Sequence, residues 1–293
     1  MTSKNGLRAG APLLILPAVL ILAVFFVVPL VWIVMLSFMT SEPAGTTEPH
    51  ATLANYTHFL TDSYYLTDLL WRTVWLSAIA TFFAVVIGYV GALVISRAPE
   101  KRQPTLMFLN MCPLWVNLVV RTLSLMVLLD RDGPVNHILM ALGITSHPVQ
   151  LLFNESAVLF GMVQMSVPFV VLSLHGVLKS IPRELEHAAM SVGANLFATF
   201  RRVTLPLSVP GILAGSILAL GINMESFVVP ILLGGGRVRF MSVAAYETAT
   251  ISNNLPFAAT IGLVLLVVTL TMLGVYQRLV GSMSRVSIAL RSA

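Results

Sequence analysis

Among the polar or charged residues within stretches that are otherwise apolar, five are candidates to bind a polar solute there: Asn117, Arg121, Gln164, Asn223 and Glu225. A charge in hydrocarbon costs roughly 3 kcal/mol or more, so Arg121 and Glu225 are expected to face protein or water. Two interpretations stay open. These residues line a translocation path in which Glu225 attracts a cationic group, or Arg121 and Glu225 form a buried ion pair that holds two helices together.

The sequence offers no set of residues for covalent or metal chemistry. An intramembrane serine protease needs a nucleophile and a histidine at one depth, and a metalloprotease needs His-Glu-x-x-His; neither spacing occurs. The single cysteine, Cys112, excludes a disulfide framework or a thiolate cluster. No Gly-x-x-x-x-Gly-Lys-Ser/Thr motif is present to hold ATP. We therefore expect no catalytic residues, no metal and no cofactor in this chain.

The composition indicates a chain embedded in lipid. Of 293 residues, 57% are apolar and only 10% are charged, and the mean hydropathy is +0.90. A soluble domain has about a quarter of its residues charged, so this chain cannot cover a folded surface with polar groups. In a membrane protein, the formal net charge of +5 is explained by basic residues in the cytoplasmic loops and does not indicate a nucleic-acid partner. The lipid bilayer is the first partner that we expect.

Six apolar stretches are long enough to cross a bilayer, which takes about 20 residues. They are approximately Pro12–Phe38, Leu69–Ile95, Leu106–Leu129, Ser156–Leu178, Leu207–Leu233 and Phe257–Val280. The fold class predicted is an all-α integral membrane protein with six transmembrane helices. Asn110, Asn117 and Arg121, spaced by seven and four residues, are expected to form one stripe on the third helix.

The basic residues predict the orientation. With a cytoplasmic N-terminus, the inner segments hold twelve of the 17 Lys and Arg residues. Because cytoplasmic loops carry an excess of positive charge, both termini are expected in the cytoplasm.

The inner loop 179–206, between the fourth and fifth spans, is predicted to be helical. Pro182 suits a first helical turn, and Glu184 and Glu186 complement the helix dipole there. Gly193 costs a helix about 1 kcal/mol relative to alanine, so it predicts a bend between two short helices. Ala189 and Gly193, four residues apart, are expected to share a face that a partner can approach closely. The alternative is an ordinary amphipathic helix lying on the bilayer surface.

This loop resembles the cytoplasmic signature of permease subunits of binding-protein-dependent ABC importers: Glu-Ala-Ala, three residues, Gly, nine residues, Ile-x-Leu-Pro. The residues at this signature are His187, Ala188, Ala189, Gly193, Ala194, Leu205 and Pro206. Val203 replaces the isoleucine, and Pro210 and Gly211 follow as they usually do in the family. One departure is His187, which stands where the family has glutamate, with Glu186 beside it.

The resemblance extends over about Leu69 to Val280 and looks like the polyamine-type branch. The residues that resemble this branch are Arg121, Leu128, Leu129, Gly133, Phe227, Val228, Pro230, Leu232, Leu233, Gly234, Gly235, Asn254, Pro256 and Phe257. In that branch an acidic residue often precedes the phenylalanine directly, whereas here Ser226 does so and Glu225 lies one residue earlier.

The resemblance implies the transmembrane fold of a type I ABC importer. Its permease core would be residues 69–280, after a first helix and outer loop (1–68) and before a cytoplasmic tail (281–293). The implied function is import across the bacterial inner membrane of a small solute, a polyamine such as spermidine or putrescine, or a related organic cation, opine or amino acid. The implied partners are an ATPase subunit dimer that binds ATP and acts through loop 179–206, a second permease that is a paralogue, and a periplasmic solute-binding protein. The alternative is an ion-coupled secondary transporter, favoured by charges in the spans and disfavoured by the signature loop.

Overall fold

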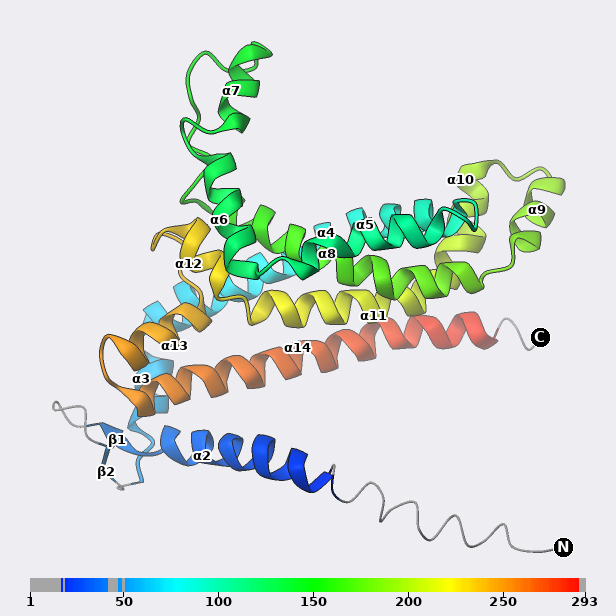
Figure 1. Ribbon diagram of the computed structural model, residues 1–293. Coiled ribbons are helices and arrows are strands. Elements are labelled where there is room, and N and C mark those ends of the chain that lie inside the picture. Colours follow the sequence, from blue (N-terminus) through cyan, green and yellow to red (C-terminus); the bar gives the residue numbers. More distant parts are fainter. Residues whose placement is uncertain (1–16, 18, 42–46, 49–50, 290–293) are drawn as a thin grey trace, which may run out of the picture. The chain divides into compact units, whose positions relative to one another are not determined.

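The computed structural model describes residues 17, 19–41, 47–48 and 51–289, and helices dominate this part of the chain (Figure 1). In chain order the elements are η1 (Ala23–Val27), α2 (Val28–Ser37), β1 (Thr40–Ser41), β2 (Thr47–Glu48), α3 (Ala54–Thr61), η2 (Tyr64–Leu70), α4 (Trp71–Arg97), α5 (Gln103–Trp115), α6 (Leu118–Leu129), α7 (Pro134–Ala141), α8 (Glu155–Ser180), α9 (Arg183–Ser191), α10 (Leu196–Thr199), η3 (Phe200–Thr204), α11 (Leu205–Met224), α12 (Val228–Gly234), α13 (Met241–Thr250) and α14 (Leu255–Ala289). The η elements are π-helical turns. Two short antiparallel strands, β1 and β2, are the only β-structure among the described residues.

The predicted spans occur in the predicted order, and five to six of them are found. Five helical stretches are long and apolar enough to cross a membrane: Val19–Ser37, Tyr64–Arg97, Glu155–Ser180, Leu196–Met224 and Leu255–Arg278. The bent pair Gln103–Trp115 and Leu118–Ala141 makes a sixth if it counts as one span. Residues 12–16 and 18 of the first predicted span lie outside the described residues.

The third predicted span is not one straight helix, because its halves α5 and α6 are bent by 92°. Pro113, inside α5, cannot donate a backbone hydrogen bond. Asn117 then has an extended backbone (φ −53°, ψ 135°), and its side chain accepts a hydrogen bond of 2.8 Å from the N–H of Val119. It is therefore the N-cap of α6. The prediction that Asn110, Asn117 and Arg121 form one stripe of a continuous helix is wrong.

The fifth predicted span, Leu207–Leu233, also differs from the structure. The helix begins earlier, at Leu196, and ends at Met224, and α12 is a separate short helix. Glu225 is the residue at which α11 stops, and it is exposed. A carboxylate within a continuous apolar helix would lie in hydrocarbon, and this break lets it leave that environment.

The chain divides into two compact units, and the expected boundaries at residues 68 and 280 stay a prediction. One unit comprises the chain up to Ser63 together with Ala244–Val264, and the other comprises Tyr64–Val243 and Leu265–Ala293. Helix α14 also continues past residue 280, where the tail was expected to begin.

In the larger unit, α4, α8 and α11 pack against one another. Glycines allow close approach of these helices, as is common in membrane proteins. A Cβ atom added at Gly88 on α4 would lie 2.7 Å from Cγ1 of Val170 on α8. One added at Gly161 on α8 would lie 2.7 Å from the side chains of Val229 and Leu233 on α12. The closely packed bundle of α4, α8 and α11 therefore positions the inner loop 179–206 and α12.

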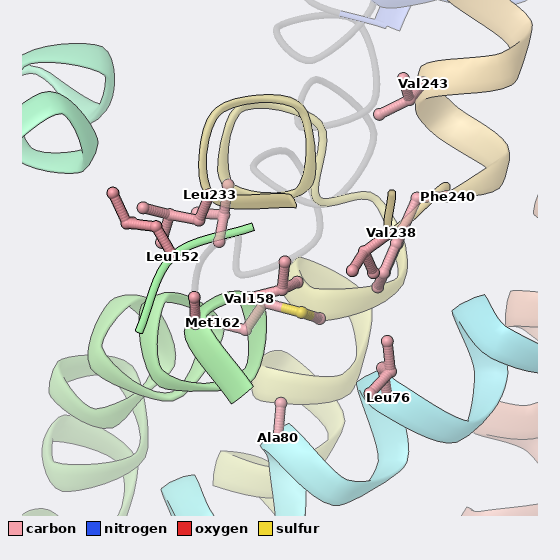
Figure 2. Packing of buried hydrophobic residues seen from close by; sticks show 11 residues of the cluster. Leu76, Ala80, Leu152, Val158, Met162, Leu233, Val238, Phe240 and Val243 are labelled. Carbon is pink, nitrogen blue, oxygen red and sulfur yellow. The ribbon is translucent and has the colours of Figure 1, made fainter. Parts of the chain in front are cut away.

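One hydrophobic cluster joins this bundle to the segment after α12. Figure 2 shows Leu76 and Ala80 on α4 near Val158 and Met162 on α8. Leu233 of α12 and Val238 and Phe240 of the following segment complete the same cluster, together with Leu152 and Val243. Burial of these side chains holds α12 and the segment after it against α4 and α8.

In the smaller unit, the C-terminal end of α2 is held by polar side chains. The Asn55 amide donates hydrogen bonds to the carbonyl oxygens of Ser37 and Met39, both at 2.9 Å. The Thr260 hydroxyl donates to the same Ser37 carbonyl at 3.2 Å. These bonds satisfy carbonyls that a helix end leaves without intrahelical partners.

Candidate coupling surface and intramembrane polar residues

The inner loop forms two short helices, as predicted. Pro182 is the N-cap of α9 rather than its first residue, with φ −61° and ψ 132°. Glu184 and Glu186 lie in the first turn of α9, as expected. After a tight turn, α10 and η3 lead directly into α11, with Leu205 and Pro206 as its first residues. Because η3 continues into α11 within the helical stretch Leu196–Met224, Pro206 removes one intrahelical hydrogen bond, directly after the π-helical turn.

Gly193 makes the turn between α9 and α10. Its φ is +91°, a left-handed conformation that glycine adopts without a steric penalty. The N–H of Gly193 donates to the Met190 carbonyl at 3.0 Å, and the N–H of Ala194 donates to the Ala189 carbonyl at 3.1 Å. This pair of bonds is a Schellman motif. The predicted bend is confirmed, but Gly193 lies beyond the end of α9 and shares no helix face with Ala189.

Glu186 anchors α9 to the ends of two spans. Its carboxylate forms an ion pair with Arg97 at the end of α4 and accepts a hydrogen bond of 2.7 Å from the Thr204 hydroxyl before α11. Arg183 donates a second bond across this junction, to the Arg97 carbonyl at 3.2 Å. Both partners belong to this chain, and both contact the same oxygen, Oε1 of Glu186. His187, next to it, is exposed.

The tip of the loop exposes large apolar side chains. Val192, Leu196 and Phe197 are 86%, 78% and 71% exposed, and we call these three residues the coupling patch. Of the signature residues, His187, Ala188 and Gly193 are exposed on the same loop, and Ala189 and Ala194 are half-buried. Leu205 and Pro206 are half-buried at the start of α11 and contribute to its position rather than to the exposed tip. Exposed apolar residues gathered on a polar loop are typical of a surface that binds another protein.

Sequence reasoning singled out the small residues of this loop and gave no role to the coupling patch. The available signal was the presence of three large apolar side chains, Val192, Leu196 and Phe197, in a segment expected outside the membrane. Their common exposure depends on the turn at Gly193, which sets the directions of both short helices.

Asn117 and Arg121 lie together at the break in the third span. They line a cleft of about 400 Å³ with Leu114, Trp115, Val116, Leu118, Met165 and Phe169. The Arg121 guanidinium donates a hydrogen bond of 3.0 Å to the Pro113 carbonyl. Arg121 therefore links the two sides of the bend, and its side chain remains partly exposed toward the cleft.

The buried ion pair between Arg121 and Glu225 is not formed. In the part of the chain that the structure describes, Arg121 has no carboxylate partner, whereas Arg72 and Arg97 form ion pairs with Glu155 and Glu186. Glu225 is exposed at the end of α11, which leaves its carboxylate accessible to a solute or a partner. Gln164 on α8 is half-buried.

Asn223 does not line a path in this structure. It is fully buried between three helices, where its amide donates to Thr81 Oγ1 on α4 at 3.1 Å. Its carbonyl oxygen accepts a hydrogen bond of 2.7 Å from Ser166 on α8. The structure therefore corrects the prediction that Asn223 lines the translocation path. This side chain instead pairs with polar groups inside the bundle.

No group of three or more metal-ligating side chains occurs among the described residues. The expectation that this chain holds no metal and no cofactor stays a prediction.

Residues 84–285 match the family model described as "Binding-protein-dependent transport system inner membrane component". The chain is 36% identical over 210 residues to the spermidine/putrescine transport system permease protein PotB of Haemophilus influenzae, covering 72% of this chain and 73% of that protein. It is 33% identical over 203 residues to PotB of Escherichia coli K12, covering 69% and 74%.

Two solved structures show the same fold. A chain of a bacterial ABC transporter that imports the acidic polysaccharide alginate superposes with a TM-score of 0.78 at 18% identity, covering 95% of this chain and 98% of that one. A chain of the inward-facing MetNI methionine ABC transporter gives a TM-score of 0.54 at 19% identity, covering 73% and 94%. The predicted type I importer fold is thereby confirmed.

The fold, the loop signature and the family match agree on one assignment. The relatives are named as transport permeases, so this chain is a transport subunit and not an enzyme. It belongs to the family of inner membrane components of binding-protein-dependent transport systems and is a multi-pass permease subunit of an ABC importer in the bacterial inner membrane.

Proposed function

We propose that this permease moves a small organic cation of the polyamine class, such as spermidine or putrescine. The proposal is supported by the identity of 33–36% to permeases named for these two solutes. It is also supported by the exposed carboxylate of Glu225, which suits an ammonium group. A related organic cation, an opine or an amino acid is the alternative solute. The fold alone does not select among them, because an importer of an acidic polysaccharide shares it.

We infer that a separate ATPase subunit dimer drives transport by binding the coupling patch. The observation that carries this inference is the exposure of Val192, Leu196 and Phe197 on a loop that is fixed to the bundle by Glu186. A partner can shift a conformational equilibrium only by binding its two states unequally. Because Glu186 ties α9 to the ends of α4 and α11, a displacement of the patch reaches both spans.

Two further partners complete the proposal. A periplasmic binding protein delivers the solute to the outer side, in keeping with the family to which the chain belongs. A second permease subunit, a paralogue of this one, forms the other half of the pathway, with Asn117, Arg121, Gln164 and Glu225 on the side of this chain.

The test is uptake of labelled spermidine into proteoliposomes that hold the complete complex and its binding protein. We expect uptake to require ATP on the ATPase side and to continue without an ion gradient. Uptake that follows an imposed proton or sodium gradient in the absence of ATP would support a secondary transporter instead. If an amino acid were taken up and spermidine and putrescine were not, the proposed solute class would be wrong. The ATP-driven mechanism would still hold.

The role of Glu225 is tested with Glu225→Gln in the same assay. We expect spermidine uptake to fall about tenfold, which corresponds to about 1.4 kcal/mol for a lost charge contact. Asp132→Asn, which neutralises another exposed acidic residue, is the matched control and should transport normally. Uptake by Glu225→Gln equal to that of the control would remove Glu225 from the path.

A further inference from the structure

A polar pocket of about 400 Å³ lies where two spans end, beside the anchor of α9. Its lining residues are Ser96, Arg97, Ala98, Pro99, Glu100, Gln103, Lys179, Ile181 and Arg183. Its volume falls in the range of ligand pockets, about 300–1000 Å³. The transport mechanism described above assigns no ligand to it.

The pocket carries a positive charge. Arg97 is neutralised by Glu186, so Lys179, Arg183 and Glu100 are the charged groups that remain, two cations and one carboxylate. Neither Lys179 nor Arg183 forms an ion pair among the described residues, although Arg183 donates to the Arg97 carbonyl. An anionic group is therefore the ligand that this charge balance favours.

Gln103 gives a second, independent indication that the pocket holds a ligand. It is 93% buried at the start of α5, and its amide nitrogen donates to the carbonyl oxygens of Ala98 at 3.0 Å and Ser96 at 3.4 Å. These bonds fix the direction of the amide, and the other atom, Oε1, is buried without a hydrogen-bond partner. Buried acceptors are nearly always paired, so the pocket calls for a donor at this point. A suitable ligand thus carries both an anionic group and a hydroxyl.

The position of the pocket selects the source of such a ligand. The spans Tyr64–Arg97 and Glu155–Ser180 both end at its edge, where helices leave the hydrocarbon and lipid headgroups begin. The expected orientation places this edge in the cytoplasmic leaflet, and basic pockets between helices on that side bind anionic headgroups.

We propose that this pocket binds the glycerophosphate headgroup of an anionic phospholipid such as phosphatidylglycerol. The phosphate accepts from Lys179 and Arg183, and a glycerol hydroxyl donates to Gln103 Oε1. Because the pocket adjoins the Arg97–Glu186 anchor, bound lipid stabilises the position of α9. The lipid-binding claim stands independently of which solute the importer moves.

The test is lipid retention by the detergent-purified complete complex, measured by native mass spectrometry after exchange into defined lipids. The variant is Lys179→Gln with Arg183→Gln. We expect roughly a 25-fold loss of retained phosphatidylglycerol, because each of the two basic residues near anionic lipid contributes a factor of about five. The matched control is Lys101→Gln with Arg102→Gln, which removes the same charge from the adjacent loop outside the pocket and should retain the lipid.

Two further arms identify the headgroup. Phosphatidylmethanol has the same charge without the glycerol hydroxyls, and we expect it to be retained less than phosphatidylglycerol. Soluble glycerol 3-phosphate should not displace the lipid; displacement would reassign the pocket to a free metabolite. Equal retention by the pocket variant and the wild type would overturn the proposal, as would an equal loss in the control. In either case spermidine uptake by the wild type would still report on the transport function separately.

Discussion

Asn223 shows how a polar residue in a span can hold helices together instead of meeting a solute. Its amide lies between Thr81 on α4 and Ser166 on α8, and none of its surface is exposed. In a lipid environment such a group must be paired inside the protein, because water is not available to it. The same residue type at the break in the third span, Asn117, instead caps a helix and borders a cleft.

Replacing Asn223 with alanine should destabilise the subunit by about 1–2 kcal/mol, since Thr81 and Ser166 lose a buried partner. The measurement is thermal unfolding of the purified complex in detergent. Gln164→Ala, on the neighbouring helix and half-buried, is the control and should change stability less. Unchanged stability of Asn223→Ala would mean that the buried network contributes nothing.

Gly193 permits a second prediction at the residue scale. Gly193→Ala should cost about 1–2 kcal/mol because an alanine must adopt φ +91°, although a Cβ there would meet no atom within 4 Å. We expect weaker binding of the ATPase subunit, measured by co-purification. Gly176→Ala has equally open space but lies inside α8, and it should be neutral or slightly stabilising. Equal behaviour of the two variants would show that the backbone of the turn is not constrained.

At the scale of elements, α9 is held by two side chains of its first turn: Glu186, through its ion pair with Arg97, and Arg183, which donates to the Arg97 carbonyl. Glu186 joins Arg97 and Thr204, whereas Glu184, two residues earlier in the same turn, is exposed. Both carboxylates complement the helix dipole, but of these two only Glu186 connects α9 to the spans. A rigid connection is what allows a displacement of a short surface helix to move long ones.

Glu186→Gln should therefore reduce solute-stimulated ATP hydrolysis of the complex several-fold. The glutamine can still accept from Thr204 but loses the charge that attracts Arg97, an effect of about 1–3 kcal/mol for a partly buried charged hydrogen bond. Glu184→Gln removes the same charge from the same turn and should hydrolyse ATP normally. If the Glu184 variant were equally impaired, the dipole rather than the anchor would explain the loss.

At the scale of the whole molecule, hydropathy predicted the spans because their length is set by the bilayer. It did not predict the 92° bend of the third span, because the apolar character of the sequence continues through the break. Pro113 and Asn117 carried that information, since a missing donor followed by a capping residue favours a break.

The turn in the inner loop could be predicted from the sequence, because its backbone conformation favours a glycine. Gly193 indicated a turn from its conformational freedom alone. The burial of Asn223 and the exposure of Phe197 were not predictable in this way, because both depend on which face of a helix meets a neighbour. Polar residues in apolar spans look alike in sequence whether they pair within the bundle or face a path.

The central claim is that a partner ATPase acts on this permease through the coupling patch. It is tested most directly by solute-stimulated ATP hydrolysis of the reconstituted complex carrying Phe197→Ser. Burial of a phenylalanine contributes about 1.5–3 kcal/mol, so stimulation should fall at least about tenfold. Leu142→Ser, which removes a side chain that is 68% exposed after α7, should leave stimulation unchanged. Full stimulation with Phe197→Ser would contradict the account.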